Sequence, residues 1–257
     1  RAFSSNADQD AKDTLRAFND TNHGYILGID RIVNTNLTLG LAGSIAKTKV
    51  NDTLVPSTTT NISTYMATFY SSLKTSRDVY VDTLLAGGVS NYHGIRTISL
   101  PGYTQDAFAK YTTQQLTVKM MVSKEISIAD LWQLTPRAMA QYTFIRQNSY
   151  TESGGSGFNT SNNPDNSNLF RLGAGSKLSL PFVAKNILSI PGVYFMAYVD
   201  AQGGYDTTNT QFISGGPIIT NTVNLSKLML TYGASYELKI SNKLELVFNY
   251  DHIYRRG

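Results

Sequence analysis

The stretch GYILGIDRIVNTNLTLGLAGSIAKTKV, residues 24–50, decides the fold class of this chain. It consists of two segments of alternating character joined by a polar turn at 34–36. Alternation of this length predicts β-strands with one apolar face, and an apolar face opposite a small, polar one is typical of a barrel wall with lipid outside and a wet or packed lumen inside. In the second segment the two faces are Leu37, Leu39, Leu41 and Ile45 against Thr38, Gly40, Ala42 and Ser44.

The composition of the chain agrees with a membrane barrel. Charged residues make up 16% of the 257 residues, whereas soluble proteins average about a quarter. Thr, Ser, Asn and 16 Tyr residues fill the difference. The mean hydropathy of −0.19 is what strands of alternating polarity produce. Since no segment of the sequence offers the roughly 18 consecutive apolar residues of a transmembrane helix, any membrane crossing has to be made by strands.

Several other classes of chemistry find no support in the sequence. The absence of cysteine excludes disulfides and thiolate chemistry. The net charge of +4 is spread without a basic run, so no nucleic-acid partner is expected. The first residues, RAFSSNADQD, carry no signal-peptide pattern, and we interpret the chain as a piece of something longer.

Strand-like segments recur along the whole length and are separated by two kinds of connection. Some connections are tight and polar (34–36, 74–78 and 241–243), and others are long and turn-rich (51–61, 100–112, 152–168 and 207–224). Short and long connections alternate, as they do in outer-membrane barrels with one tight rim and one rim of loops. The predicted strands are 1–5, 23–33, 36–50, 61–74, 78–98, 112–126, 132–150, 168–182, 192–206, 224–240 and 243–254.

These segments predict an all-β fold, an antiparallel transmembrane β-barrel that forms one domain over residues 1–257. About eleven strands are represented, whereas bacterial single-chain barrels have even numbers. The first strand is a stub, and the last one, 243–254, has no partner after it. Because an open edge in lipid leaves costly unpaired backbone groups, we expect the barrel to be truncated at both ends.

The charged residues of the predicted strands share a face with Gly and Ser. A charge on the lipid face would cost about 2–4 kcal/mol at the bilayer midplane, so this face is expected to line the lumen. The candidate pore-lining residues are Gly28, Asp30, Gly40, Asp82, Gly88, Arg137, Arg171, Gly173, Gly175, Lys177, Gly233 and Glu237.

Three features of the strands leave alternatives open. The inward glycines either provide small walls for something that passes or plugs the lumen, or relieve the curvature of a tight barrel. Pro136, which lacks an N–H donor, is expected at the first paired residues of its strand or at a bulge. Six aromatic residues form girdles at the membrane interfaces or merely reflect aromatic β-propensity: Tyr25, Trp132, Tyr142, Tyr194, Tyr236 and Tyr250.

Candidate groups for catalysis or metal binding are few. The three histidines have no metal-ligand spacing, and phosphate-binding loops and nucleophile motifs are missing from the sequence. Four strand aspartates are either acid–base groups or, more simply, solvated lumen charges: Asp30, Asp82, Asp200 and Asp251. We therefore predict no catalytic residue, no metal site and no cofactor, and do not expect an enzyme.

Four passages resemble the C-terminal translocator, or β-domain, of type Va autotransporters. GYILGIDRIVNTNLTLGLAGS (24–44) resembles the second and third strands of that family, its most recognisable block. RAFSS (1–5) is similar to the second half of the opening strand, and TPRAMAQYTFIRQNSYTESGG (135–155) to a strand that ends in an aromatic-rich stretch. LMLTYGASYELKISNKLELVFNYD (228–251) is similar to the penultimate hairpin. The richness in Asn, Thr, Ile, Tyr and Lys also resembles rickettsial surface antigens.

The resemblance implies a barrel of twelve strands in the bacterial outer membrane. Its pore would hold a helix that leads to an N-terminal passenger, which the barrel anchors and carries to the cell surface. The implied partners are outer-membrane lipid, the passenger and the outer-membrane assembly machinery, and the implied state is a monomer. The pore helix would precede Arg1 and the closing strand would follow Gly257, so no self-cleavage site can be assigned within this sequence.

Three other classes of function remain open from the residues alone. An outer-membrane pore or adhesin barrel would act by diffusion or through external loops such as 152–168. A soluble β-sandwich or ligand-binding barrel would need the reverse arrangement, with the leucines in a sealed apolar centre and Arg171 and Glu237 in water. A barrel enzyme that uses Asp82 and Asp200 is the least expected class.

Overall fold

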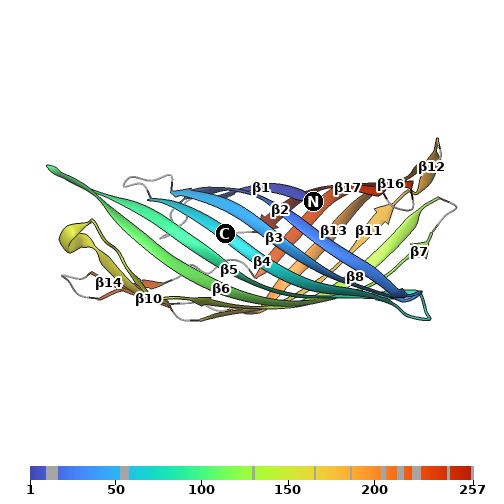
Figure 1. Ribbon diagram of the computed structural model, residues 1–257, viewed down its shortest axis with the longest axis horizontal. Coiled ribbons are helices and arrows are strands. Elements are labelled where there is room, and N and C mark those ends of the chain that lie inside the picture. Colours follow the sequence, from blue (N-terminus) through green and yellow to red (C-terminus); the bar gives the residue numbers. More distant parts are fainter. Residues whose placement is uncertain are drawn as a thin grey trace.

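The protein is a single curved β-sheet with a smaller sheet at one end (Figure 1). The computed structural model describes residues 1–9, 17–52, 58–128, 131–164, 166–185, 187–203, 207–212, 217–221, 227–241 and 244–255. The large sheet has 13 strands and curves round so that its first and last strands lie near each other. Apart from a single 3₁₀ turn, the regular structure of these residues is entirely β. The predicted all-β antiparallel fold is therefore confirmed.

Eleven strands form the continuous path of the large sheet, in the order in which they occur along the chain. Each is antiparallel to its neighbours, as a barrel built from hairpins requires. Two short strands lie outside this path: β7 (Ile126–Ser127) pairs with β8, and β12 (Phe182–Ala184) pairs with β13. The path consists of β1 (Ala2–Gln9), β2 (Phe18–Asn34), β3 (Leu37–Asp52), β4 (Thr58–Lys74), β5 (Val79–Leu100), β6 (Tyr103–Lys124), β8 (Gln133–Gln147), β11 (Ser167–Ser179), β13 (Ile187–Gly203), β16 (Leu228–Ser241) and β17 (Leu244–Arg255).

Large apolar side chains cover the outer face of this sheet, and polar ones lie inside. Leu41 and Leu27 are 58% and 78% exposed, whereas Thr143 and Asp200 on the inner face are 5% exposed. Among the described residues the buried polar or charged residues outnumber the buried apolar ones twelve to six, and no large side chain is fully buried. A sealed apolar centre is therefore missing from the described part, which argues against a soluble β-sandwich.

The hairpin of β5 and β6 is longer than the sequence pattern predicts. Residues 100–112 are not a loop, because both strands continue outward to a two-residue turn at 101–102, where Gly102 has a φ of 77°. Inner-face alanines hold this extension together through packing: Ala107 is fully buried and Ala109 is 8% exposed. Such small residues give no alternation of large apolar side chains, which is why the pattern failed here.

Two other connections predicted as loops contain most of the second sheet. Its strand order is β15–β14–β10–β9, with β10 (Thr160–Pro164) from the connection predicted at 152–168 and β14 (Thr207–Phe212) and β15 (Pro217–Asn221) from the one predicted at 207–224. The remaining strand, β9 (Tyr150–Thr151), lies just before the first of these connections. The 3₁₀ turn η1 (Ser156–Phe158) joins β9 to β10. Parts of the predicted connections lie outside the described residues: 53–57, 165, 213–216, 222–224 and 242–243.

Pro136 occupies an interruption of the ladder inside β8 rather than its start or a bulge. Arg137 pairs with Ser123 of β6, and the pairing resumes between Leu134 and Ile126 of β7. The register does not shift across the gap. On the side of β8 that faces β6 and β7, the ladder makes no hydrogen bond at Pro136, so the N–H that proline lacks is not needed there. This corrects both sequence expectations for Pro136, the first paired residues of the strand and a bulge.

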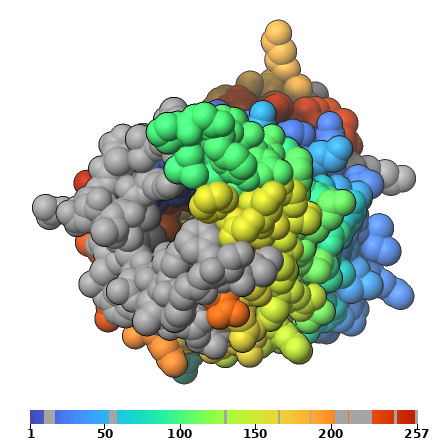
Figure 2. Space-filling model, turned by 90° about the vertical axis from the view of Figure 1, so that its left-hand side faces the viewer, coloured from blue at the N-terminus to red at the C-terminus, as the bar shows by residue number. Residues whose placement is uncertain are grey.

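The segment 150–160 is held against the β5–β6 hairpin by a buried ion pair. Arg96 of β5 donates from Nη2 and Nε to the two carboxylate oxygens of Glu152, at 2.5 and 3.1 Å. Glu152 is 8% exposed and also accepts a bond from the Thr160 N–H at 2.9 Å. Phe108 and Ser153 exchange two backbone hydrogen bonds beside this pair. Figure 2 shows this yellow segment lying against the green hairpin.

A stack of three tyrosines extends the contact between the segment 150–160 and the β5–β6 hairpin. The rings of Tyr92 and Tyr111 lie 4.6 Å apart, and those of Tyr111 and Tyr150 lie 4.4 Å apart, both nearly parallel. Asn162 donates from Nδ2 to the Tyr150 hydroxyl at 3.0 Å. Burial raises the pKa of both Tyr111 and Tyr150. The stack thus stays neutral at physiological pH and packs as an apolar cluster.

The Arg96–Glu152 pair predicts that docking of this segment weakens in acid. Burial alone raises the pKa of Glu152, but hydrogen bonds from Arg96 and Thr160 outweigh it and hold the pKa below its usual value. A carboxyl with a lowered folded-state pKa gives stability that is present above pH about 4.3 and is lost as the pH falls through the folded pKa. Hydrogen exchange of the 150–160 amides, corrected for intrinsic rates, should therefore accelerate below pH about 4.

A matched pair of variants separates this ion pair from general effects of charge. Glu152→Gln should loosen the segment at neutral pH by about 1–3 kcal/mol, because the partly buried Arg96 loses its carboxylate and keeps only its bond to the Phe158 carbonyl. Lys74→Gln, which breaks an exposed pair with Asp78, should change the free energy of opening by less than about 1 kcal/mol. Unchanged exchange of the 150–160 amides in Glu152→Gln would show that the ion pair does not hold the segment.

Candidate functional site, the polar lumen

Charged side chains on the inner face neutralise one another across neighbouring strands. Arg171 of β11 stands opposite Asp200 of β13 and donates from Nε at 2.6 Å. Arg255 of β17 bonds the other oxygen of the same carboxylate at 2.7 Å. With Asp200 only 5% exposed, these two guanidinium groups provide the partners that a buried carboxylate requires. Asp200 is thus a buried structural charge rather than the solvated lumen charge of the simpler sequence interpretation.

A second ion pair spans two strands because a glycine lies between them. Lys177 of β11 donates from Nζ to Glu237 of β16 at 2.6 Å. The lysine side chain passes over Gly192 of β13, where a Cβ would lie 2.7 Å from the lysine Cε. A larger residue at 192 would therefore block the path of the lysine.

Tyrosine rings cover three of the inward glycines. Tyr70 lies across Gly40 and donates its hydroxyl to Asp30 at 3.3 Å. A Cβ at Gly40 would overlap the Tyr70 ring, and Tyr198 and Tyr194 cover Gly173 and Gly233 in the same way. The space in front of these glycines is thus occupied by a neighbouring ring, an explanation that neither sequence alternative contained. Tyr194 also faces inward, so its assignment to an interfacial girdle was wrong, whereas the large aromatics Tyr25 and Tyr250 face outward.

A cavity of about 470 Å³ remains between these side chains. Three of the predicted pore-lining residues, Arg137, Lys177 and Glu237, meet there. Arg1 and Lys119 were not predicted as cavity residues, whereas Asp251, one of the strand aspartates considered as a lumen charge, does line the cavity. Lys119 is on the same face as Thr113 and Thr117 of β6, a period-two signal that could have found it. Arg1 also brings its guanidinium within 2.9 Å of the Asn249 amide oxygen, once that amide is oriented to its neighbours.

The other predicted pore-lining residues are dispersed around the inner face and do not line this cavity. Asp82, Gly88 and Gly175 lie on inward-facing positions of β5 and β11. Gly28 and Asp30 lie on the part of β2 beyond its pairing with β1, and both are exposed. That all these residues line a pore stays a prediction.

Positive charge is incompletely balanced in the cavity. Four cationic side chains line the cavity against two carboxylates: Arg1, Lys119, Arg137 and Lys177 against Glu237 and Asp251. Arg137 also has a buried Nε without a hydrogen-bond partner. Unpaired buried donors are rare in native proteins, and each one calls for a physical explanation such as a water or another group that bonds it. In the described residues no group of three or more His, Asp or Glu side chains could hold a metal ion. In the same residues, helices long and apolar enough to cross a bilayer do not occur.

Comparison with known proteins assigns the class of this barrel. The family model of the autotransporter beta-domain matches residues 1–251, and the chain belongs to that family. Among solved structures, the translocator domain of the autotransporter NalP from Neisseria meningitidis superimposes with a TM-score of 0.79 at 14% identity, covering 98% of this chain and 80% of that one. The β-domain of the Bordetella autotransporter BrkA gives a TM-score of 0.64 at 15% identity, with 99% and 90% covered.

Two curated relatives are more similar in sequence. Outer membrane protein A of Rickettsia conorii is 26% identical over 268 residues, and its counterpart in Rickettsia rickettsii is 26% identical over 263 residues. These matches cover 94% and 97% of this chain but only 13% and 11% of the relatives. The chain thus spans about an eighth of their length. Together with the family, they place this barrel in the bacterial outer membrane.

The Gly40–Tyr70 contact predicts a compensating pair of mutations. Gly40→Val should lower the free energy of unfolding by about 1–3 kcal/mol, because the new side chain competes with the ring for one space. Adding Tyr70→Ala should remove that cost, so the double variant should lose less than the sum of the two single ones. Urea unfolding followed by tryptophan fluorescence measures all three, and strictly additive losses would contradict the contact.

Proposed function

We propose that this barrel anchors a passenger domain in the outer membrane and that the passenger polypeptide reaches the cell surface through the polar lumen. The observation that supports this role is the lumen itself, with buried hydroxyls and ion pairs on its wall and a cavity in which the buried Nε of Arg137 has no hydrogen-bond partner. An extended polypeptide carries unpaired N–H and C=O groups, which can cross a membrane only where polar groups or water can bond them.

In this proposal the inward residues divide into two roles. Paired charges such as Arg171, Asp200 and Glu237 brace the wall, because each already has its partner. Lys119 and Arg137 are the groups available to a polypeptide inside the lumen, since Arg137 keeps a buried donor without a partner. Carbonyl and carboxylate oxygens of that polypeptide are the natural acceptors for these cations.

Three narrower points belong to the same proposal. We propose that the domain acts in transport rather than catalysis, that it is inserted by the outer-membrane assembly machinery, and that it works as a monomer. The alternation of faces supports the last point, because the outer face is suited to hydrocarbon rather than to a wet protein interface.

Neighbouring residues of β16 offer a matched test of the export route. Ser235 faces the cavity and Ala234 faces outward. In the full-length protein, Ser235→Trp should reduce the fraction of passenger at the cell surface severalfold, because a bulky ring fills the lumen, whereas Ala234→Trp should leave it unchanged. Protease accessibility on intact cells measures the surface fraction, and heat-modified gel mobility verifies that both barrels are folded. Equal export by both variants would contradict the route.

A further inference from the structure

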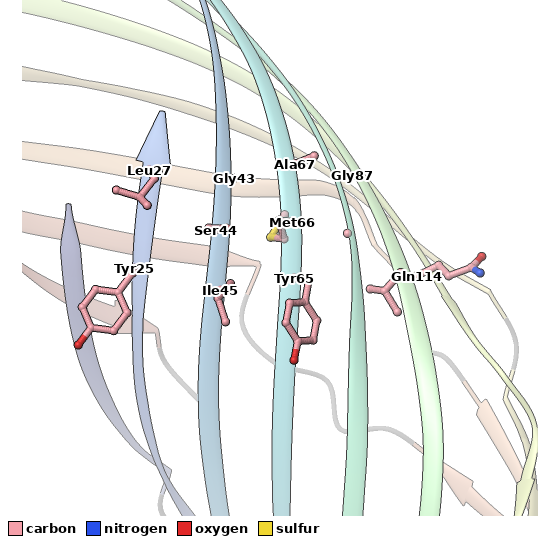
Figure 3. Close-up of a pocket in the computed structure, with 12 residues that line it drawn as sticks. Tyr25, Leu27, Gly43, Ser44, Ile45, Tyr65, Met66, Ala67, Gly87 and Gln114 are labelled. Atoms are coloured by element: carbon pink, nitrogen blue, oxygen red, sulfur yellow. The ribbon is translucent and has the colours of Figure 1, made fainter. Parts of the chain in front are cut away.

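The outer face of the barrel carries an apolar groove of about 790 Å³ (Figure 3). Its floor is formed by Gly43, Ala67 and Gly87, which lie side by side on β3, β4 and β5. Leu27 and Leu116 close the two ends of this row. Since adjacent strands are about 4.8 Å apart, the floor from Gly43 to Gly87 is roughly 10 Å long, an extended slot that a segment of a linear chain fits.

The glycines of the groove differ from those of the lumen. A Cβ at Gly43 would meet only the Met66 carbonyl oxygen at 4.0 Å, and one at Gly87 only the Gln115 carbonyl oxygen at 3.9 Å. Neither the fold nor a neighbouring side chain therefore requires glycine at these two positions. The space in front of them is open, and in hydrocarbon an unfilled slot forfeits the dispersion contacts of its lining.

One wall of the groove lies at the edge of the apolar outer face that is nearer to the second sheet. Tyr25, Ile45, Tyr65, Val89 and Gln114 lie in register across five strands and form this wall. Tyrosines at such an edge mark the membrane interface. The wall lies toward the end of the barrel that bears the second sheet and the long connections, which is the external end of an outer-membrane barrel. The groove thus opens to the outer leaflet.

Two rows of outward-facing residues lie next to this wall, on the side away from the groove floor. They contain cationic side chains and no carboxylate. The first row is Ser4, His23, Lys47, Ser63, Asn91 and Thr112, and the second is Asn6, Thr21, Lys49, Asn61, His93 and Lys110. Lys47 and Lys49 are exposed, and neither has a hydrogen-bond or ion-pair partner among the described residues. The nearest outward carboxylate of this part of the sheet, Asp8, stands one row further on.

We propose that this groove binds a phosphorylated lipid of the outer leaflet, with an acyl chain in the slot over Gly43, Ala67 and Gly87 and the phosphate against Lys47 and Lys49. An acyl chain gains little by leaving other lipid tails for an apolar protein surface, so the slot provides fit and the lysines provide the preference for negative charge. Lys47 lies two residues, about 7 Å, beyond the wall residue Ile45, within reach of a headgroup. The site does not depend on passenger export.

Lipid binding to the full-length protein extracted from outer membranes in detergent tests the proposal. Native mass spectrometry gives the apparent Kd of the first bound lipid for phosphatidylglycerol and for phosphatidylcholine with the same acyl chains. We expect phosphatidylglycerol to bind about fivefold more tightly or better. Lys47→Gln with Lys49→Gln should abolish the preference, and Gly87→Leu, whose Cβ has open space and whose side chain would occupy the slot, should weaken the binding of both lipids severalfold.

Lys124→Gln provides the matched control. Lys124 also faces outward at an exposed position, but at the opposite rim of β6, so its loss should not change the preference. Heat-modified gel mobility verifies the fold of each variant. Equal affinity for the two lipids, or a preference that survives loss of Lys47 and Lys49, would overturn the proposal. A mass of two chains that Gly87→Leu dissociates would also overturn it, since a second copy would then occupy the groove.

Discussion

In hydrocarbon a backbone N–H or C=O group without a partner has no water to bond, and this constraint governs every other feature of the protein. It is met here by an antiparallel ladder that runs strand by strand from β1 to β17. Because successive side chains of a strand point to opposite faces, satisfying the ladder also sorts the side chains. Once Leu41 and its outward neighbours meet lipid, the intervening small and charged residues must surround the lumen.

The interior that results is packed with polar contacts. Asp200 is enclosed by two guanidinium groups, and Lys177 crosses Gly192 to reach Glu237. Tyrosine rings lie over inward glycines, so the absence of a side chain on one strand gives space to a large side chain on the next. The same residue type has the opposite consequence outside, where the space over Gly43 and Gly87 stays open. Glycine thus makes room for a neighbouring ring in the lumen wall and leaves open space on the lipid face.

The fold was largely predictable because period-two alternation reports directly on which face meets lipid. The prediction from alternation failed where the packing does not depend on large apolar residues. The β5–β6 extension is held by alanines such as Ala107, and the 150–160 segment by the Arg96–Glu152 pair and stacked tyrosines. The Arg96–Glu152 pair joins residues 56 positions apart, a separation that no local pattern reveals. The candidate site was found in part, since Arg137 and Lys177 follow from alternation, whereas the juxtaposition of Arg1 with β17 depends on how the sheet curves.

The arrangement of the barrel requires that alternate residues of β3 face lipid and lumen. The chain has no cysteine, so Leu41→Cys and Ala42→Cys each accept one fluorescent label without background. In vesicles that contain brominated lipid, the label at 41 should be strongly quenched and the label at 42 should be quenched little, although the two residues are adjacent. Equal quenching at both positions, or stronger quenching at 42, would contradict the proposed facing of the strands.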